Sequence, residues 1–158
     1  MNNNRILILN GPGLSDLSAY QGYNYGALSL EKIERECSKL CKSEGLELEF
    51  RQTDDDDQMF RWIAKDSDKF AGLIINPVGY SQAANVEFEM YRSSIRMIAH
   101  LRKPVVEVHI TNIFNQGTDI TKPLQAPKGE MGFICGLGYH GYLLAIQSVA
   151  NKLRAEQN

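Results

Sequence analysis

The sequence has few cysteines, no long apolar run and almost no net charge, and each scarcity excludes a class of protein. Three cysteines in 158 residues are an odd number and too few for a disulfide framework, so we expect a reducing, cytoplasmic compartment. Seventeen Lys+Arg against 19 Asp+Glu leave a net charge of -2, which gives no electrostatic support for nucleic-acid binding. No stretch approaches the ~18 consecutive apolar residues of a membrane span. The N-terminus has no basic segment and no cleavage site, so we expect no signal peptide.

Few residues stand at the spacing of metal ligands. Cys37 and Cys41 are four residues apart and could hold a metal from one helix face. Cys37 also falls on an apolar stripe over 30–40, which favours a thiol packed as a small hydrophobe. The three histidines are far apart in sequence, and the aspartate run Asp54–Asp57 suits the start of a helix. We therefore predict no zinc site.

Short apolar runs alternate with segments of helical period along the whole chain. The pattern predicts strands at 5–10, 46–52, 70–77, 104–110 and 131–137. It predicts helices at 29–43, 85–101 and 139–154, and a further helix that opens at 54–57. This alternation is typical of one α/β domain, here residues 1–158, with a parallel sheet and helices on both faces. Five strands with this spacing fit the flavodoxin-like order 2-1-3-4-5.

Polar residues follow three of the predicted strands at the point where each strand ends. Ligands of open parallel sheets bind beyond the carboxyl ends of the strands, near the point where the strand order reverses. The segments 10–13, 76–80 and 107–112 meet there under the predicted order. Any one of their asparagines could simply bond loop backbone, but the three segments together favour a ligand site, because buried polar groups need partners.

The segment Gly136–Gly141 matches the dinucleotide-binding pattern GxGxxG, follows a predicted strand and opens a helix. It follows the last strand, however, and no further strand can carry the acidic residue that such a site needs ~20 residues later. We interpret these glycines as permitting close packing of the last helix on the sheet.

Five segments together resemble the type II 3-dehydroquinate dehydratases. They are ILILNGPGL at 6–14, the pair Tyr25-Gly26, IINPVGY at 74–80, PVVEVHITN at 104–112 and ICGLGYHGYLL at 134–144. The match is collinear over nearly the whole chain. It implies a flavodoxin-like domain assembled as a trimer-based homododecamer, without metal or cofactor. It also implies a small carboxylate substrate that loses a proton alpha to a ketone and then a beta hydroxyl.

The resemblance assigns roles to individual residues. Tyr25 matches the catalytic base, a phenolate on a mobile loop. His109 matches the histidine that assists departure of the hydroxyl, and Glu107 is the carboxylate two residues before it. Asn76 matches the asparagine that binds the substrate carboxylate. Ile110 and Thr111 match the pair whose backbone and hydroxyl hold the same carboxylate, with threonine in place of serine.

Other positions of the binding site depart from the family pattern. Gly13 stands in place of an asparagine that positions a water near the developing enolate. Tyr20 stands in place of an arginine whose charge would lower the pKa of the catalytic tyrosine. Gln82 and Glu89 replace a histidine and an aspartate, and Ile120 aligns with a lid arginine. In the family, these last groups recognise ring hydroxyls.

Three interpretations follow for the function. The first is a lyase of this family with altered recognition of a small, cyclic carboxylate. The second is ordinary dehydration of 3-dehydroquinate in the shikimate pathway of aromatic amino-acid biosynthesis. The third is a non-catalytic scaffold that binds small acids or serves assembly.

Overall fold

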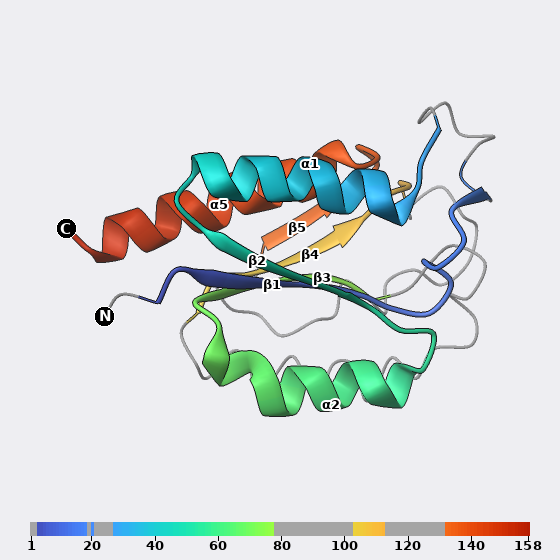
Figure 1. Cartoon of the computed structure of the whole chain (residues 1–158), viewed down its shortest axis with the longest axis horizontal. Helices are drawn as coiled ribbons and strands as arrows, with labels where there is room; N and C mark the ends of the chain where they lie inside the picture. Colours follow the sequence, from blue (N-terminus) through green and yellow to red (C-terminus); the bar gives the residue numbers. More distant parts are fainter. Residues whose placement is uncertain (1–2, 19, 21–26, 78–102, 113–131) are drawn as a thin grey trace.

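Five parallel strands form one sheet in the order β2-β1-β3-β4-β5 (Figure 1). They are β1 (Arg5–Asn10), β2 (Glu47–Gln52), β3 (Gly72–Asn76), β4 (Val105–His109) and β5 (Gly132–Cys135). The computed structural model describes residues 3–18, 20, 27–77, 103–112 and 132–158. The strand order confirms the flavodoxin-like arrangement predicted from the sequence, and the helix expected at 85–101 lies outside the described residues.

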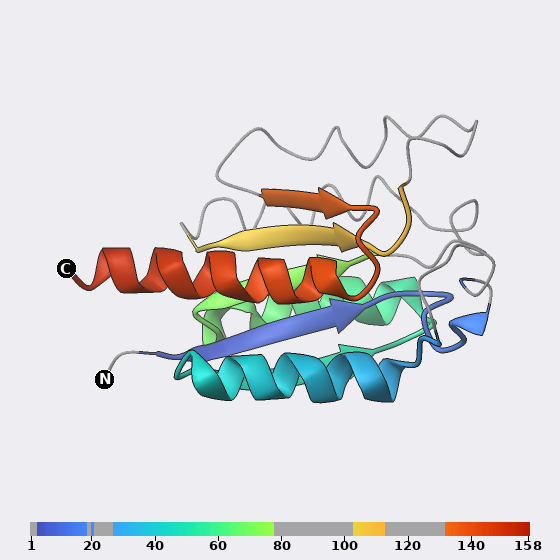
Figure 2. The ribbon, with the colours of Figure 1, turned by 90° about the horizontal axis from the view of Figure 1, so that it is seen from above.

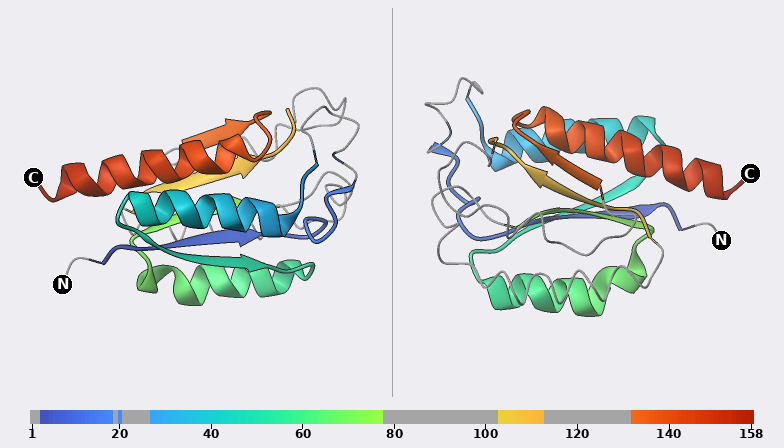
Figure 3. Two further views of the ribbon diagram at one scale, coloured as in Figure 1. Left: turned by 45° about the horizontal axis from the view of Figure 1, so that its top comes forward. Right: turned by 180° about the vertical axis from the view of Figure 1, so that it is seen from behind.

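The described helices cover both faces of the sheet. Helices α1 (Leu30–Ser43) and α5 (His140–Glu156) lie side by side on one face (Figures 1 and 3). Helix α2 (Asp56–Asp66), followed by the 3-10 turn η2 (Ser67–Lys69), lies on the other. None of the helices in these parts of the chain is long and apolar enough to cross a bilayer.

Local signals at the helix ends behave as the sequence predicts. The Ser29 hydroxyl accepts a hydrogen bond from the Lys32 amide at 3.1 Å and caps α1. The helix ends before Gly45, whose φ of 73° lies in the left-handed region that glycine adopts without strain. The Asp55 carboxylate caps α2 by accepting from the Asp57 amide, so the aspartate run does begin a helix.

Strand β1 separates two hydrophobic clusters. Ile6 and Ile8 are fully buried in a cluster on the side of α1 and α5, whereas Leu7 and Leu9 are fully buried in a cluster on the side of α2. This alternation repeats along β3 and β4, since successive side chains of a strand point to opposite faces. A central strand covered on both faces explains why the run RILILN is almost wholly apolar.

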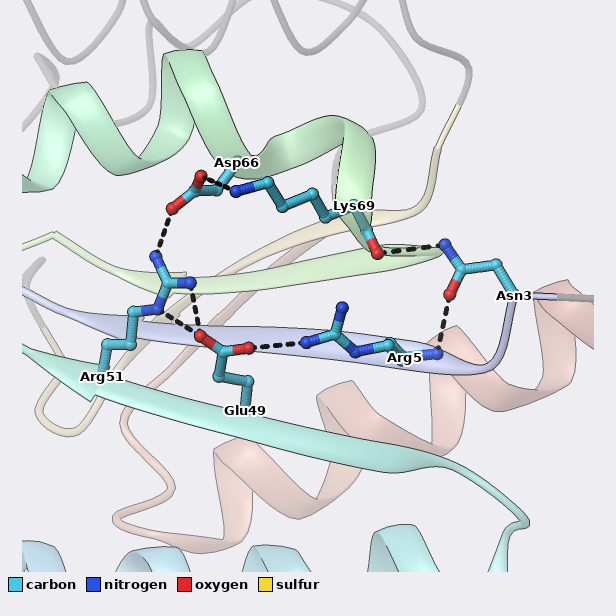
Figure 4. Close-up of polar contacts among 6 residues, drawn as sticks. All are labelled: Asn3, Arg5, Glu49, Arg51, Asp66 and Lys69. Atoms are coloured by element: carbon cyan, nitrogen blue, oxygen red, sulfur yellow. Dashed lines mark hydrogen bonds and ion pairs between the residues drawn. The ribbon is translucent and has the colours of Figure 1, made fainter.

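The edge strand β2 presents charge to the α2 side of the sheet. Its Arg51 Nη1 lies 2.6 Å from the Asp66 carboxylate of α2, and Arg51 also pairs with Glu49. Arg5 Nη2 lies 2.8 Å from the other oxygen of Glu49, and Lys69 Nζ lies 2.8 Å from Asp66 (Figure 4). Hydrogen bonds from Lys69 and Arg51 hold the pKa of Asp66 below its ordinary value. Charged side chains on an edge strand discourage pairing with a strand of another chain.

Strands β1 and β3 end in direct backbone contact. The Gly11 amide donates to the Asn76 carbonyl at 2.9 Å. A Cβ on Gly11 would lie 2.1 Å from the Pro77 carbonyl oxygen and 2.9 Å from Met59 Sδ. Only glycine lets the two strand ends approach this closely, because the nearest obstacle is backbone that cannot rotate away.

Gly11→Ala should therefore lower the free energy of unfolding by about 3 kcal/mol, because the added methyl overpacks a site that cannot relax. Gly45→Ala is the matched control: its Cβ meets nothing within 4 Å and only its φ of 73° is unfavourable. That control should cost about 1 kcal/mol. Urea unfolding at one fixed protein concentration measures both, and equal losses would contradict the steric argument.

Candidate active site

Buried polar residues gather where the central strands end. The structure describes six buried polar or charged residues, and five of them lie at the carboxyl ends of β1, β3 and β4. They are Asn10, Asn76, Glu107, His109 and Thr111. The arrows of β1, β3 and β4 point toward this same edge of the sheet (Figure 2). The convergence of strand-end polar groups that the sequence predicts is thus present.

Glu107 and His109 form a buried pair on β4. His109 Nε2 lies 3.0 Å from Glu107 Oε2, and the two side chains are 5% and 0% exposed. They stand two residues apart on one strand and therefore point to the same face. Phe133 of β5 packs beside the imidazole, with 5.6 Å between ring centroids. A carboxylate that holds Nε2 fixes the ring and leaves Nδ1 as its other hydrogen-bonding atom.

A hydrogen-bonded chain runs along the opposite face of the same edge. Asn76 Nδ2 donates to the Tyr142 hydroxyl at 2.9 Å, and that hydroxyl donates to Asn10 Oδ1 at 2.7 Å. Asn10 Nδ2 in turn donates to the Arg51 carbonyl at 3.1 Å. Tyr142 comes from α5 and is fully buried, and this burial raises the pKa of its phenol above the ordinary value.

The sequence places Tyr142 in the predicted last helix and does not indicate what its hydroxyl bonds. A signal was present, since a buried tyrosine on a stripe with Ile146 and Val149 needs a partner for its O–H group. The pattern does not tell which partner. Asn10 and Tyr142 are 132 residues apart, and only the assembled sheet brings them together.

The turn after β5 packs against the end of β4. The Gly138 amide donates to the Ile110 carbonyl at 3.0 Å, and the Gly136 amide donates to the His109 carbonyl at 3.2 Å. A Cβ on Gly141 would lie 3.3 Å from Val108 Cγ1 and from Ile134 Cγ2. Gly141 therefore serves close packing of α5 on the sheet, as we expected, whereas Gly136 and Gly138 have positive φ values of 84° and 59° and serve the turn. This contact also fixes the backbone at Ile110, which is 1% exposed, next to Thr111.

The loop after β1 is held by Asp54. Its carboxylate accepts from the Gly13 amide at 3.1 Å, from Ser15 Oγ at 2.8 Å and from Gln52 Nε2 at 2.9 Å. Burial raises the pKa of Asp54, but these hydrogen bonds outweigh it and the net pKa is lowered. Gly13 has a φ of 86°. Asparagine is among the few other residues that tolerate this region of φ. Glycine at position 13, in place of the family's asparagine, therefore keeps the backbone conformation and removes only a side chain.

Of the remaining predicted site residues, only Tyr20 lies in the described part of the chain. Tyr20 is 3% exposed and packs in the α1/α5 cluster with Leu14 and Leu17, so its ring is part of the core. The other four, namely Tyr25, Gln82, Glu89 and the Ile120 position, lie outside the described residues. The structure therefore brings together Asn76, the Glu107–His109 pair and the Ile110–Thr111 turn at one edge of the sheet.

Comparison with known proteins connects this chain to one family. The model of the family "Dehydroquinase class II" matches residues 4–150. A 3-dehydroquinate dehydratase of Mesorhizobium japonicum is 36% identical over 148 residues, which are 94% of this chain and 98% of the relative. A 3-dehydroquinate dehydratase of Clostridium botulinum (strain Langeland) is 32% identical and covers 98% of this chain and 97% of its own.

The solved structures agree with the sequence relatives. The crystal structure of type II dehydroquinase from Propionibacterium acnes superposes with a TM-score of 0.73 at 28% identity, and covers 94% of this chain and 97% of its own. The family match, the relatives above 30% identity and the shared five-stranded topology lead to one conclusion. The chain belongs to the class II dehydroquinase family, a family of carbon–oxygen lyases.

Proposed function

We propose that the chain dehydrates a small cyclic carboxylate that carries a ketone and a beta hydroxyl, with a substrate specificity that differs from that of the ordinary family enzyme. The observation that carries the proposal is the buried Glu107–His109 pair at the sheet edge, 3.0 Å between Nε2 and Oε2. A buried carboxylate that holds one ring nitrogen of a neighbouring imidazole orients the ring, which suits a group that transfers a proton.

The reaction divides into proton removal and departure of water. Tyr25 takes the proton alpha to the ketone, and the electrons of the broken C–H bond form an enolate. The enolate collapses, the carbon–oxygen bond to the beta hydroxyl breaks, and His109 donates the proton with which the hydroxyl leaves as water. Tyr25 then returns its proton, directly or through water, and His109 is protonated again. The sum is loss of one water without an external oxidant or reductant.

The substrate carboxylate binds on the other side of the edge in this proposal. Asn76 Nδ2 donates to the carboxylate, together with the backbone at Ile110 and the Thr111 hydroxyl. Asn76 is fully buried, and Ile110 and Thr111 are 1% and 5% exposed. Donors that are already fixed and desolvated bind an anion better than mobile ones, because little entropy is lost on binding.

The altered specificity rests on the positions that depart from the family pattern. A phenol with the ordinary pKa of about 10 is ionised in about one molecule per thousand at pH 7, a cost of roughly 4 kcal/mol in available base. Tyr20, in place of the family's loop arginine, brings no charge to offset that cost. Gln82, Glu89 and Ile120 replace the groups that recognise ring hydroxyls, and each lost polar contact removes discrimination worth a few kcal/mol.

The second candidate is ordinary dehydration of 3-dehydroquinate in the shikimate pathway. The observation that favours it is the similarity to two 3-dehydroquinate dehydratases, at 32% and 36% identity. Both candidates use the same residues and differ in how fast 3-dehydroquinate itself reacts.

The specificity proposal predicts that 3-dehydroquinate is turned over far more slowly than by a typical family enzyme. The missing arginine alone accounts for about a thousandfold, if no other group lowers the pKa of the base. The absorbance of the conjugated enone product measures the rate directly. A turnover of several per second would favour the second candidate and overturn the altered specificity.

A second prediction concerns which contacts bind the ligand. Asn76→Ala should weaken cyclohex-1-ene-1-carboxylate about tenfold or more, since a hydrogen bond to a charged group contributes roughly 1.5–3 kcal/mol. Tyr25→Phe should leave this binding intact and abolish exchange of the alpha proton of 3-dehydroquinate for deuterium, because it removes only the base.

Calorimetry measures binding of the carboxylate, and deuterium exchange measures removal of the alpha proton, in each variant. Asn3→Ala, which removes an amide at the opposite end of β1, is the matched control and should change neither quantity. Exchange that persists in Tyr25→Phe would show that another group is the base. If the unmodified chain binds neither cyclohex-1-ene-1-carboxylate nor 3-dehydroquinate, the interpretation that remains is a non-catalytic scaffold that serves assembly.

We also propose that the chain forms a trimer-based homododecamer. Leu137 and Leu144, next to the edge strand β5 and at the start of α5, are 48% and 44% exposed, and parallel-sheet edges are pairing liabilities. Light scattering should therefore give a mass near twelve times the 17.8 kDa of one chain. A mass near 17.8 kDa would contradict the assembly.

A further inference from the structure

The Asn76–Tyr142–Asn10 chain has a fixed direction, set by the group at its far end. The Arg51 carbonyl can only accept a hydrogen bond, so Asn10 must turn its Nδ2 toward it. Asn10 then faces Tyr142 with its carbonyl oxygen Oδ1, which can only accept, so the Tyr142 hydroxyl must donate to it at 2.7 Å. A hydroxyl that donates its one hydrogen accepts from any other partner.

The same logic determines the orientation of Asn76. Because the Tyr142 oxygen acts as acceptor toward it, Asn76 must present Nδ2 and not Oδ1, at 2.9 Å. Rotation of the amide by 180° would exchange its donor for its acceptor and set Oδ1 against the lone pairs of the Tyr142 oxygen. One main-chain carbonyl on β2 thus decides, through two side chains, which end of the Asn76 amide faces α5 and which way its second N–H points.

We propose that Tyr142 is a positioning residue for substrate binding: its hydroxyl locks the Asn76 amide in the orientation that directs an N–H toward the substrate carboxylate. This rests on the proposed function, which gives Asn76 the carboxylate. With the amide rotated, Oδ1 would face a carboxylate, and two acceptors repel each other. Tyr142 itself touches no reacting atom.

Burial keeps the donor-to-acceptor direction of these hydrogen bonds constant over pH. Tyr142 is fully buried, which raises the pKa of its phenol, so the hydroxyl keeps its hydrogen throughout the range in which proteins are studied. Tyr20, Leu14 and Ile146 belong to the same hydrophobic cluster as Tyr142, and apolar packing on this side excludes water that could replace the hydroxyl.

Tyr142→Phe tests the inference, because it removes the hydroxyl and retains the ring. We expect KM for 3-dehydroquinate to rise about fivefold to tenfold while kcat changes less than about twofold, since ground-state binding of the carboxylate is what is lost. Val149→Ala is the control for general destabilisation: it truncates a buried residue of the same helix and cluster, away from the hydrogen-bonded chain. It should leave KM unchanged.

A double-mutant cycle separates positioning from a merely structural role. In the Asn76→Ala background the hydroxyl has no amide left to orient, so Tyr142→Phe should then change KM by less than about twofold. An equal rise in both backgrounds would overturn the proposal, because the effect would not pass through Asn76. So would an unchanged KM in the single variant, or a rise matched by Val149→Ala.

Neutron crystal structures of the unmodified chain and of Tyr142→Phe, which distinguish amide nitrogen from amide oxygen, keep the inference separate from the proposed function. We expect one orientation of the Asn76 side chain in the first and a rotated or doubled one in the second. If the unmodified chain binds neither 3-dehydroquinate nor cyclohex-1-ene-1-carboxylate, the proposed function fails, and a changed Asn76 still supports the orienting role of Tyr142. An unchanged Asn76 overturns that role whatever the activity is.

Discussion

The hydroxyl of Tyr142 joins the last helix to the first and third strands at the point where both strands end. Asn10 and Asn76 are fully buried amides, and each would lose the free energy of an unmade hydrogen bond without a partner. The protein resolves this with one group that both accepts and donates, at 2.9 Å and 2.7 Å. This junction ties the position of α5 on the sheet to the ends of β1 and β3, where the candidate site lies.

Much of the fold follows from local pattern. The bounds predicted for β1 hold, and α1 begins after Ser29 and ends before Gly45 as the capping signals indicate. Pattern fails where the partner is distant in sequence. The Asp54 carboxylate looks like part of a helix start, yet it holds Gly13 and Ser15, about 40 residues earlier. Tyr142 looks like core for the same reason, since periodicity predicts that a face is buried and not what its polar atom touches.

The candidate site, like the fold, could be predicted from the sequence only in part. Asn76, Glu107 and His109 could be predicted to converge, because parallel strands in a known order end at one edge. Asn76 lies on one face of the sheet and the Glu107–His109 pair on the other, which also follows from alternation along each strand. Their roles could not be derived from pattern and came from family resemblance, which covers the loop tyrosine as well. The hydrogen-bond directions that orient the amides needed the assembled structure.

The Asn76–Tyr142–Asn10 hydrogen bonds and the Glu107–His109 pair support different conclusions about function. The chain through Tyr142 has a structural use, since it satisfies two buried amides and fixes α5, so a non-catalytic scaffold would keep it too. The hydrogen bond between Glu107 and His109, in contrast, joins two residues of the same strand. Burying a carboxylate is costly, and apolar residues of similar volume are generally as stabilising as a buried charged pair. Phe133 packs beside His109, and Val105 of the same face of β4 lies in the apolar α2-side cluster, so apolar residues would pack well at these positions. A buried carboxylate–imidazole pair at the edge where parallel sheets bind ligands is therefore the feature of this structure that argues most directly for chemistry.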